Sequence, residues 1–147
     1  MNGHVLDIPD IWEIYINKEL GISFNYPYFW AKASSEHFVG IDGFFHIIPI
    51  YSEKSIEEIC GLEAFHKLLP YGTEPKITSV EVCNRKAFYI FPSEDQPIEM
   101  KRQSALILKH SEEHSNPDNN YKYFILRADK EHVEKIAESI SLIKNEF

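Results

Sequence analysis

The sequence predicts an α+β fold, a mainly antiparallel sheet built from hairpins with helices packed on its faces. Two observations carry this prediction. Segments with a period of two occur in neighbouring pairs joined by short turns, which is the pattern of antiparallel hairpins. Only two segments have a helical period, whereas a parallel sheet would need strands and helices in alternation.

The N-terminal part predicts a hairpin followed by a central strand. Apolar and polar residues alternate in "WEIYIN" (12–17) and "GISFNYP" (21–27), on either side of "KELG". Pro27 has no N–H for the ladder and is expected to end the second strand, and Trp30 is expected to cover the core nearby. "GFFHIIPI" (43–50) is apolar on both faces, which indicates a central strand covered on both sides.

The first helix is predicted over residues 55–69. Ser55 and Glu58 form a capping box, in which the hydroxyl accepts a backbone N–H and the carboxylate reaches back. The apolar residues change phase at Gly61, which predicts a bend there, and Pro70 is expected to end the helix. The two apolar faces are Ile56, Ile59 and Cys60, and then Ala64, Phe65, Leu68 and Leu69.

The second half of the chain predicts another hairpin, two further strands and a second helix. The hairpin is "KITSVEVCNRKAFYIF" (76–91), with Asn84 best able to adopt a positive φ at its turn. The polar segment "HSEEHSNPDNN" joins the two strands that follow, "SALILKH" and "YKYFILRA". Asp129 is expected to cap the last helix, near residues 130–140.

The segment "PYGTEP" (70–75) has two interpretations. In the first it is a stiff corner, because Gly72 permits a positive φ and Pro75 directs the chain into the next strand. Tyr71 would then pack its ring and hydrogen-bond its hydroxyl to a backbone group. In the second interpretation it forms one lip of a groove, and the groove candidates are Tyr71, Tyr89, Ser93 and Gln96.

The length and the net charge of the chain limit which functions are expected. The 147 residues fit one domain, with residues 1–10 as a loose N-terminal arm. The 15 basic and 23 acidic residues give a net charge of −8, which argues against a nucleic-acid partner and an anionic membrane surface. No signal peptide or membrane-spanning segment is recognisable, so a cytoplasmic location is expected, or an extracytoplasmic one if the sequence is part of a larger anchored protein.

No residue pattern predicts catalysis or a cofactor. His110 and His114 would face the same way only on a helix, and their segment is a poor helix former, so we expect a solvated loop without metal. Cys60 and Cys83 lie in apolar patterns and are expected to be reduced, and Cys60 and His66 would face different sides of one helix. Ser93 stands among turn residues, and nucleophile-elbow, phosphate-loop and zinc-helix motifs are missing from the sequence.

Three segments resemble the PsbP-like fold. "LGISFNYPYFW" is similar to its opening hairpin strand, and "LLPYGTEPKI" and "AFYIFPSEDQP" resemble small bacterial domains of this kind, some attached to membrane-anchored peptidase-like or TolB-like proteins. The resemblance runs from about Trp12 to Ile143 and departs from the pattern at "CNRKA". It implies a PsbP-like α/β/α sandwich. Other members of the fold are binding modules, among them a photosystem subunit and a nuclear-import regulator that binds a small GTPase.

Two functions follow as hypotheses. The first is a non-enzymatic interaction or regulatory module that binds a protein partner through a sheet edge or an acidic surface. The second is a small-molecule binder or weak enzyme that uses an aromatic pocket near Tyr71 and Ser93. An unpaired strand edge on the surface would favour the first, and a closed apolar cavity would favour the second.

Overall fold

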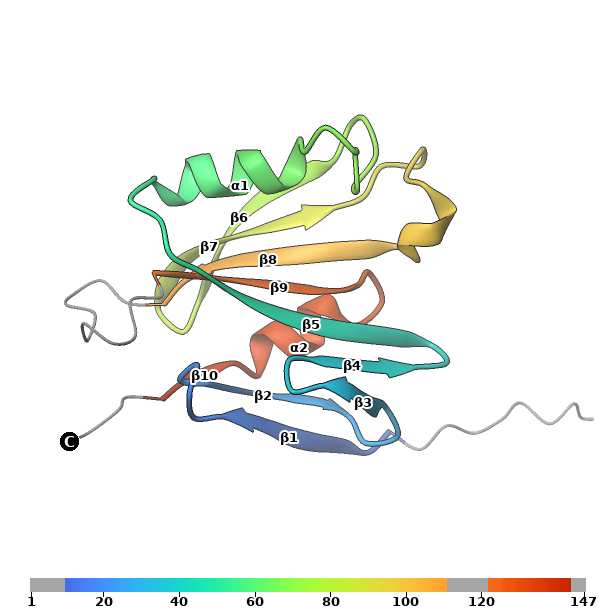
Figure 1. The fold of residues 1–147 in the computed structure, drawn as a ribbon, viewed down its shortest axis with the longest axis vertical. Coiled ribbons are helices and arrows are strands. Elements are labelled where there is room, and N and C mark those ends of the chain that lie inside the picture. The colour runs from blue at the N-terminus through green and yellow to red at the C-terminus, as the bar shows by residue number, and fades with distance from the viewer. Residues whose placement is uncertain (1–9, 111–121, 144–147) are drawn as a thin grey trace, which may run out of the picture.

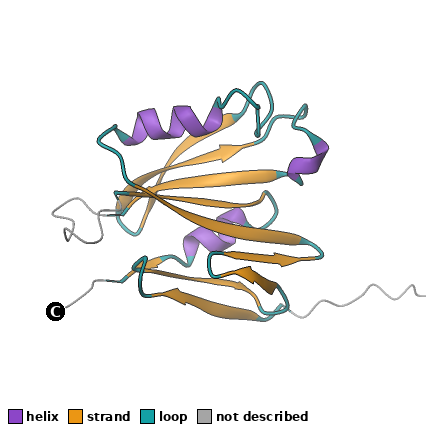
Figure 2. Cartoon of the chain, viewed as in Figure 1, coloured by secondary structure: helices purple, strands orange, loops and turns teal. Residues whose placement is uncertain are grey.

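The computed structural model describes residues 10–110 and 122–143, and all strand pairs in it are antiparallel. The strands form two sheets (Figure 2). The larger sheet has seven strands in the order β3-β4-β5-β9-β8-β7-β6, and the smaller has three in the order β1-β2-β10. The larger sheet consists of β3 (Ala31–Ser34), β4 (His37–Gly40), β5 (Gly43–Ile50), β9 (Tyr123–Asp129), β8 (Gln103–Lys109), β7 (Arg85–Phe91) and β6 (Lys76–Val82). The smaller sheet consists of β1 (Trp12–Asn17), β2 (Ile22–Pro27) and β10 (Ser141–Leu142).

Different elements pack on the two faces of the larger sheet (Figure 1). The helix α1 (Ile56–Ala64) packs over β7 and β8 on one face. On the other face, α2 (Val133–Glu138) and the smaller sheet enclose the main core, in which the rings of Tyr15, Phe24 and Phe45 lie 4.8–5.0 Å apart. Because α1 lies over β7 and β8, it leaves the β4–β5 side of its face open.

Most of the predicted hairpins and turns are confirmed. The β1–β2 and β6–β7 hairpins have the predicted strands, and β5 is central, between β4 and β9. Asn84 adopts φ 60° at the β6–β7 turn, where Cys83 is also left-handed. Trp30 is buried in the main core, as predicted. Cys60 faces the sheet from α1, and both cysteines are free.

Some elements were not predicted, and the first helix was predicted with the wrong extent. The hairpin β3–β4, the short strand β10 and the 3-10 helix η1 (Ile98–Met100) were not predicted. Helix α1 continues through Gly61 without a break and ends at Ala64 instead of residue 69. Of the predicted second apolar face only Ala64 is buried, because Phe65 and Leu68 are 57% and 73% exposed.

The start of α2 also differs from the prediction. Asp129 is the last residue of β9 and does not cap the helix, because the residue at the N-cap is His132, three positions later. The Asp129 carboxylate instead bonds to the side chain of His132 and to the backbone of Phe44. Of the predicted N-terminal arm, residues 1–10, all but Asp10 lie outside the described residues.

Candidate functional site

The corner over residues 70–75 is tied to the loop that follows β7. Ser93 donates its backbone N–H to the Tyr71 carbonyl at 2.9 Å. The side-chain amide of Gln96 donates to the Pro70 carbonyl, also at 2.9 Å. Three of the four groove candidates therefore come together here, and their polar groups are used in bonds within the protein.

Gly72 makes this corner possible. Its φ of +84° lies in the left-handed region that favours glycine. A Cβ at this position would stand 2.1 Å from the Ser93 Oγ and 2.5 Å from an Asp95 carboxylate oxygen. Hydrogen bonds from Ser93 and Thr73 lower the pKa of Asp95 to about 2. The corner is closed around Gly72, as the first interpretation of "PYGTEP" requires.

Tyr71 is fully buried beneath the end of α1. Its hydroxyl donates to the Glu63 carboxylate, so the predicted bond to a backbone group is wrong. Arg127 of β9 donates twice to the same carboxylate, at 2.8 and 2.9 Å. Burial and the nearby Glu63 charge raise the pKa of the Tyr71 hydroxyl. This network fastens α1 to the sheet and leaves Tyr71 no free surface for a ligand.

Tyr89 does not join the other groove candidates. It lies in the main core on the opposite face of the sheet, and its ring stacks on Phe91 with centroids 5.3 Å apart. Strand alternation explains this, because the neighbouring residues Phe88 and Ile90 of β7 are the ones that face α1. Burial raises the pKa of Tyr89 to about 12.

The predicted metal-free loop lies mostly outside the described residues, and so does His114. His110 is described at the end of β8, where its ring meets that of Phe124 with centroids 4.8 Å apart. Within residues 10–110 and 122–143, no group of three or more metal-ligating side chains comes together.

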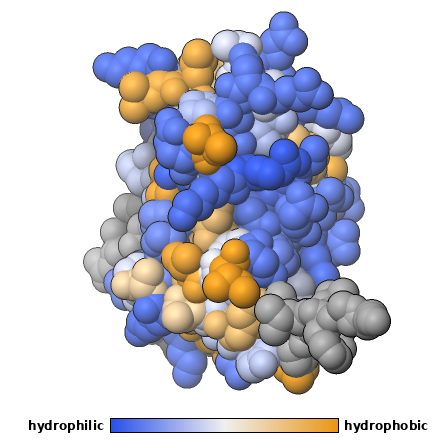
Figure 3. All heavy atoms as spheres, turned by 90° about the vertical axis from the view of Figure 1, so that its right-hand side faces the viewer, coloured by the Kyte–Doolittle hydropathy of each residue, from blue (hydrophilic) through white to orange (hydrophobic). Residues whose placement is uncertain are grey.

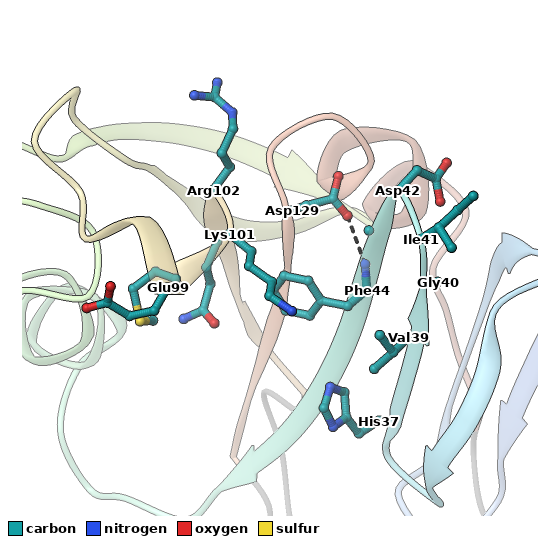
Figure 4. Close-up of a pocket in the computed structure, with 13 residues that line it drawn as sticks. His37, Val39, Gly40, Ile41, Asp42, Phe44, Glu99, Lys101, Arg102 and Asp129 are labelled. Atoms are coloured by element: carbon teal, nitrogen blue, oxygen red, sulfur yellow. Dashed lines mark hydrogen bonds between the residues drawn. The ribbon is translucent and has the colours of Figure 1, made fainter. Parts of the chain in front are cut away.

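A hollow of about 640 Å³ lies where α1 leaves the larger sheet uncovered (Figure 4). Val39 of β4 and Phe44 of β5 form its apolar floor. One wall is the β4–β5 turn, which carries Ile41, and the other is the η1 turn, residues 99–102. The full lining is His37, Val39, Gly40, Ile41, Asp42, Gly43, Phe44, Glu99, Met100, Lys101, Arg102, Gln103 and Asp129.

The η1 wall carries two strained basic residues. Lys101 and Arg102 have φ values of 52° and 61°, and such left-handed residues each cost about 1–3 kcal/mol unless they are glycine. Arg102 forms an ion pair with Glu131 at 3.5 Å, whereas the described residues provide Lys101 with no anionic partner. The side chain of Lys101 extends from the turn in the direction of Phe44 (Figure 4).

The opposite wall is held by a histidine between two carboxylates. His132 lies 2.7 Å from Asp129 and 3.5 Å from Asp42, and Asp42 also accepts the Trp30 indole N–H at 2.8 Å. Asp129 accepts the Phe44 backbone N–H at 3.0 Å (Figure 4). The bond to Asp129 raises the pKa of His132. These contacts fix the β4–β5 turn against the end of β9.

The hollow combines an apolar floor with charged side chains on its walls. Its lining contains neither serine, threonine nor cysteine, so it offers none of the usual nucleophiles of these types. The Asp129 carboxylate is engaged by His132 and the Phe44 backbone. Viewed from this end, hydrophobic residues form separate patches above and below a band of hydrophilic ones (Figure 3). Apolar anchors beside charged side chains are typical of binding surfaces.

Sequence reasoning missed this hollow because it missed the hairpin β3–β4. All four residues of β3 are exposed, so they give no alternation of apolar and polar residues. One signal was available: "GIDG" (40–43) contains the Asp-Gly pair that is common in hairpin turns.

Comparison with known proteins bears on the fold. No family model matches the chain, and no curated protein matches it. The solution structure of cyanobacterial PsbP (CyanoP) from Synechocystis sp. PCC 6803 superposes with a TM-score of 0.52. The fold is PsbP-like. The match covers 97% of this chain and 98% of the other at 11% sequence identity, so the PsbP-like fold is what the two proteins share.

The remaining resemblance predicted from the sequence concerns bacterial domains attached to anchored proteins, and it stays a prediction. None of the helices in the described parts of the chain is long and apolar enough to cross a membrane.

Proposed function

We propose that this protein is a non-enzymatic binding module whose protein partner docks at the hollow between the β4–β5 turn and η1. One observation carries the proposal. Ile41 on one wall and Ile98 in η1 are 87% and 91% exposed, the highest exposures among the large hydrophobic residues described. Ile41 belongs to one wall of the hollow, and Ile98 directly precedes the residues 99–102 that form the other wall. Exposed isoleucines beside an open, apolar-floored hollow provide the anchors that a protein interface needs.

The charged residues around the hollow suit a partner surface that carries both positive and negative charges. Lys101 and Glu99 come from one wall and Asp42 from the other. Rim charges of this kind set the orientation and rate of docking more than its affinity. A cytoplasmic location belongs to the same proposal, and the two free cysteines support a reducing compartment.

The alternative is a small-molecule site in the same hollow, because its volume falls within the range of ligand pockets, about 300–1,000 Å³. The corner near Tyr71 and Ser93 is a poorer place for a ligand, because Tyr71 is fully buried and Ser93 is bonded within the corner.

Affinity capture from the native host tests the proposal. The wild-type chain and three variants serve as baits: Ile41→Lys, Ile98→Lys and Leu62→Lys. Leu62 is 59% exposed on α1 and does not line the hollow, so it is the matched control. We expect one protein to be captured by wild type and Leu62→Lys and lost by the two hollow variants, all four baits having the same melting temperature. Capture by all four baits, or by none, would refute docking at the hollow.

A further inference from the structure

The described sheets end in four edge strands, β1 and β10 in the smaller sheet and β3 and β6 in the larger. Proteins protect such edges by keeping them short, charged, polar or bulged. β10 has two residues, β3 carries Lys32 and a bulge beside it, and β6 begins with Lys76 and is mostly polar. These three strands are protected in ways that natural sheets use.

β1 is less protected, because Glu13 is its only charged residue. It has six residues, and two of its side chains, Ile14 and Ile16, are 67% and 56% exposed. They lie on the same face of the strand, which is the face opposite to that of the buried Tyr15.

The backbone of the same residues is also open. Tyr28 donates its N–H to the Ile11 carbonyl at 3.0 Å, so residue 11 is hydrogen-bonded to the strand of β2. In an antiparallel ladder such pairs alternate, so residues 13, 15 and 17 also point their N–H and C=O groups toward β2. The N–H and C=O groups of Trp12, Ile14 and Ile16 therefore point to the free side of the sheet.

We propose that β1 pairs with β1 of a second copy of this chain, antiparallel about a two-fold axis at Ile14. Only the even-numbered residues have free backbone groups, so even residues must face even residues. With the axis at Ile14, the two Ile14 residues face each other and Trp12 faces Ile16 of the second copy. All exposed apolar side chains of β1 then meet apolar partners, and Glu13 faces Tyr15 rather than a like charge.

A neighbouring register is poorer. With the axis at Tyr15, Ile14 would face Ile16 of the second copy, but Trp12 would face Lys18, beyond the end of the strand. A second copy therefore matches this edge residue by residue, as an isologous interface requires. The pairing would join two three-stranded sheets into one of six strands.

The charge of the chain predicts how the dimer responds to salt. Each copy carries a net charge of −8, and two such copies repel each other. Because salt screens this repulsion, the dimer fraction should rise with ionic strength, whereas a dimer held by surface ion pairs would weaken.

Sedimentation equilibrium on the whole chain, at up to about 1 mM protein, tests the dimer. We expect the mass to rise toward twice the 17.2 kDa of one chain, and to rise further in high salt. Ile14→Lys should remain monomeric, and Ile41→Lys, changed at the hollow instead, should dimerise like wild type. A wild type that stays monomeric throughout, or an Ile14→Lys variant that dimerises equally, overturns the proposal.

Disulfide cross-linking tests the register. Facing residues in a hydrogen-bonded antiparallel pair have Cα atoms about 5.5 Å apart, within the range a disulfide can span. In a Cys83→Ser background, Ile14→Cys should give a covalent dimer on a non-reducing gel. Ile16→Cys, which is also exposed but faces Trp12, should give at least tenfold less. Equal cross-linking of both variants, or none by Ile14→Cys, refutes the two-fold axis at Ile14.

Discussion

Replacing glycine by alanine should have opposite effects at Gly72 and at Gly61. At Gly72, alanine must adopt φ +84° and place its Cβ 2.1 Å from the Ser93 Oγ. That hydroxyl donates to Asp95 at 2.5 Å and accepts the Glu74 N–H at 3.2 Å, so moving it breaks the corner's hydrogen bonds. Backbone strain of about 1 kcal/mol and the loss of two hydrogen bonds of about 1 kcal/mol each should lower the free energy of unfolding by about 2–3 kcal/mol.

Gly61 is the matched control. It lies inside α1, and a Cβ built there meets nothing within 4 Å. Alanine should therefore stabilise the protein by about 1 kcal/mol, the difference in helix propensity.

Thermal and urea unfolding of the two variants measure the difference. For a domain of this size, 1 kcal/mol shifts the melting temperature by about 2–4 °C, so Gly72→Ala should melt about 4–12 °C lower and Gly61→Ala slightly higher than wild type. Gly72→Val should lose more than Gly72→Ala, because a β-branched side chain tolerates a positive φ least. If Gly72→Ala melts at or above the wild-type temperature, the corner is not closed in the way described.

Three further predictions concern buried polar groups. Tyr71→Phe should lower the free energy of unfolding, measured by chemical denaturation, by about 1–2 kcal/mol. Glu63→Ala should lower it by about 3–5 kcal/mol, because Arg127 loses its only described carboxylate partner. Equal losses in the two variants would contradict this network. The raised pKa of His132 stabilises the folded state most below the unfolded value of 6.5, and this stability is lost as pH rises through the raised pKa. His132→Asn should therefore flatten the dependence of the unfolding free energy on pH above pH 6. An unchanged dependence would show that the contacts of His132 with Asp129 and Asp42 contribute nothing. Burial raises the pKa of Cys60 to about 11, so a thiol reagent at pH 8 should label Cys60 only after unfolding, and fast labelling of the native chain would contradict its burial.

The parts of the fold that the sequence predicts well rest on local signals. The capping box of Ser55 and Glu58 spans three residues, and both of its hydrogen bonds form. The β6–β7 hairpin has alternating residues on either side of a turn at Asn84. In both cases the interacting groups are close in sequence, so composition and spacing contain the information.

The remaining parts depend on contacts between distant residues. Arg127 reaches Glu63 across 64 positions and ties α1 to the sheet. The end of α1 was predicted wrongly for a similar reason. Phe65 and Leu68 have the spacing of a buried helix face, but α1 extends over the sheet only as far as Ala64. Whether an apolar residue is buried depends on what lies opposite it, which spacing does not reveal.

The most conspicuous motifs of this chain contribute to its stability, whereas the proposed contacts use residues that looked ordinary in the sequence. The Pro70 carbonyl and the hydroxyls of Thr73 and Ser93 are hydrogen-bonded within and between "PYGTEP" and "PSEDQP", so they offer little to a partner. Ile14 and Ile41 are the reverse case, because exposed side chains gain almost no burial energy when the monomer folds. Their lysine variants should therefore stay within about 0.5 kcal/mol of wild type in unfolding. Any loss of association in these variants then reports on the surface itself, and because β1 and the hollow are separate elements, each proposal can fail without the other.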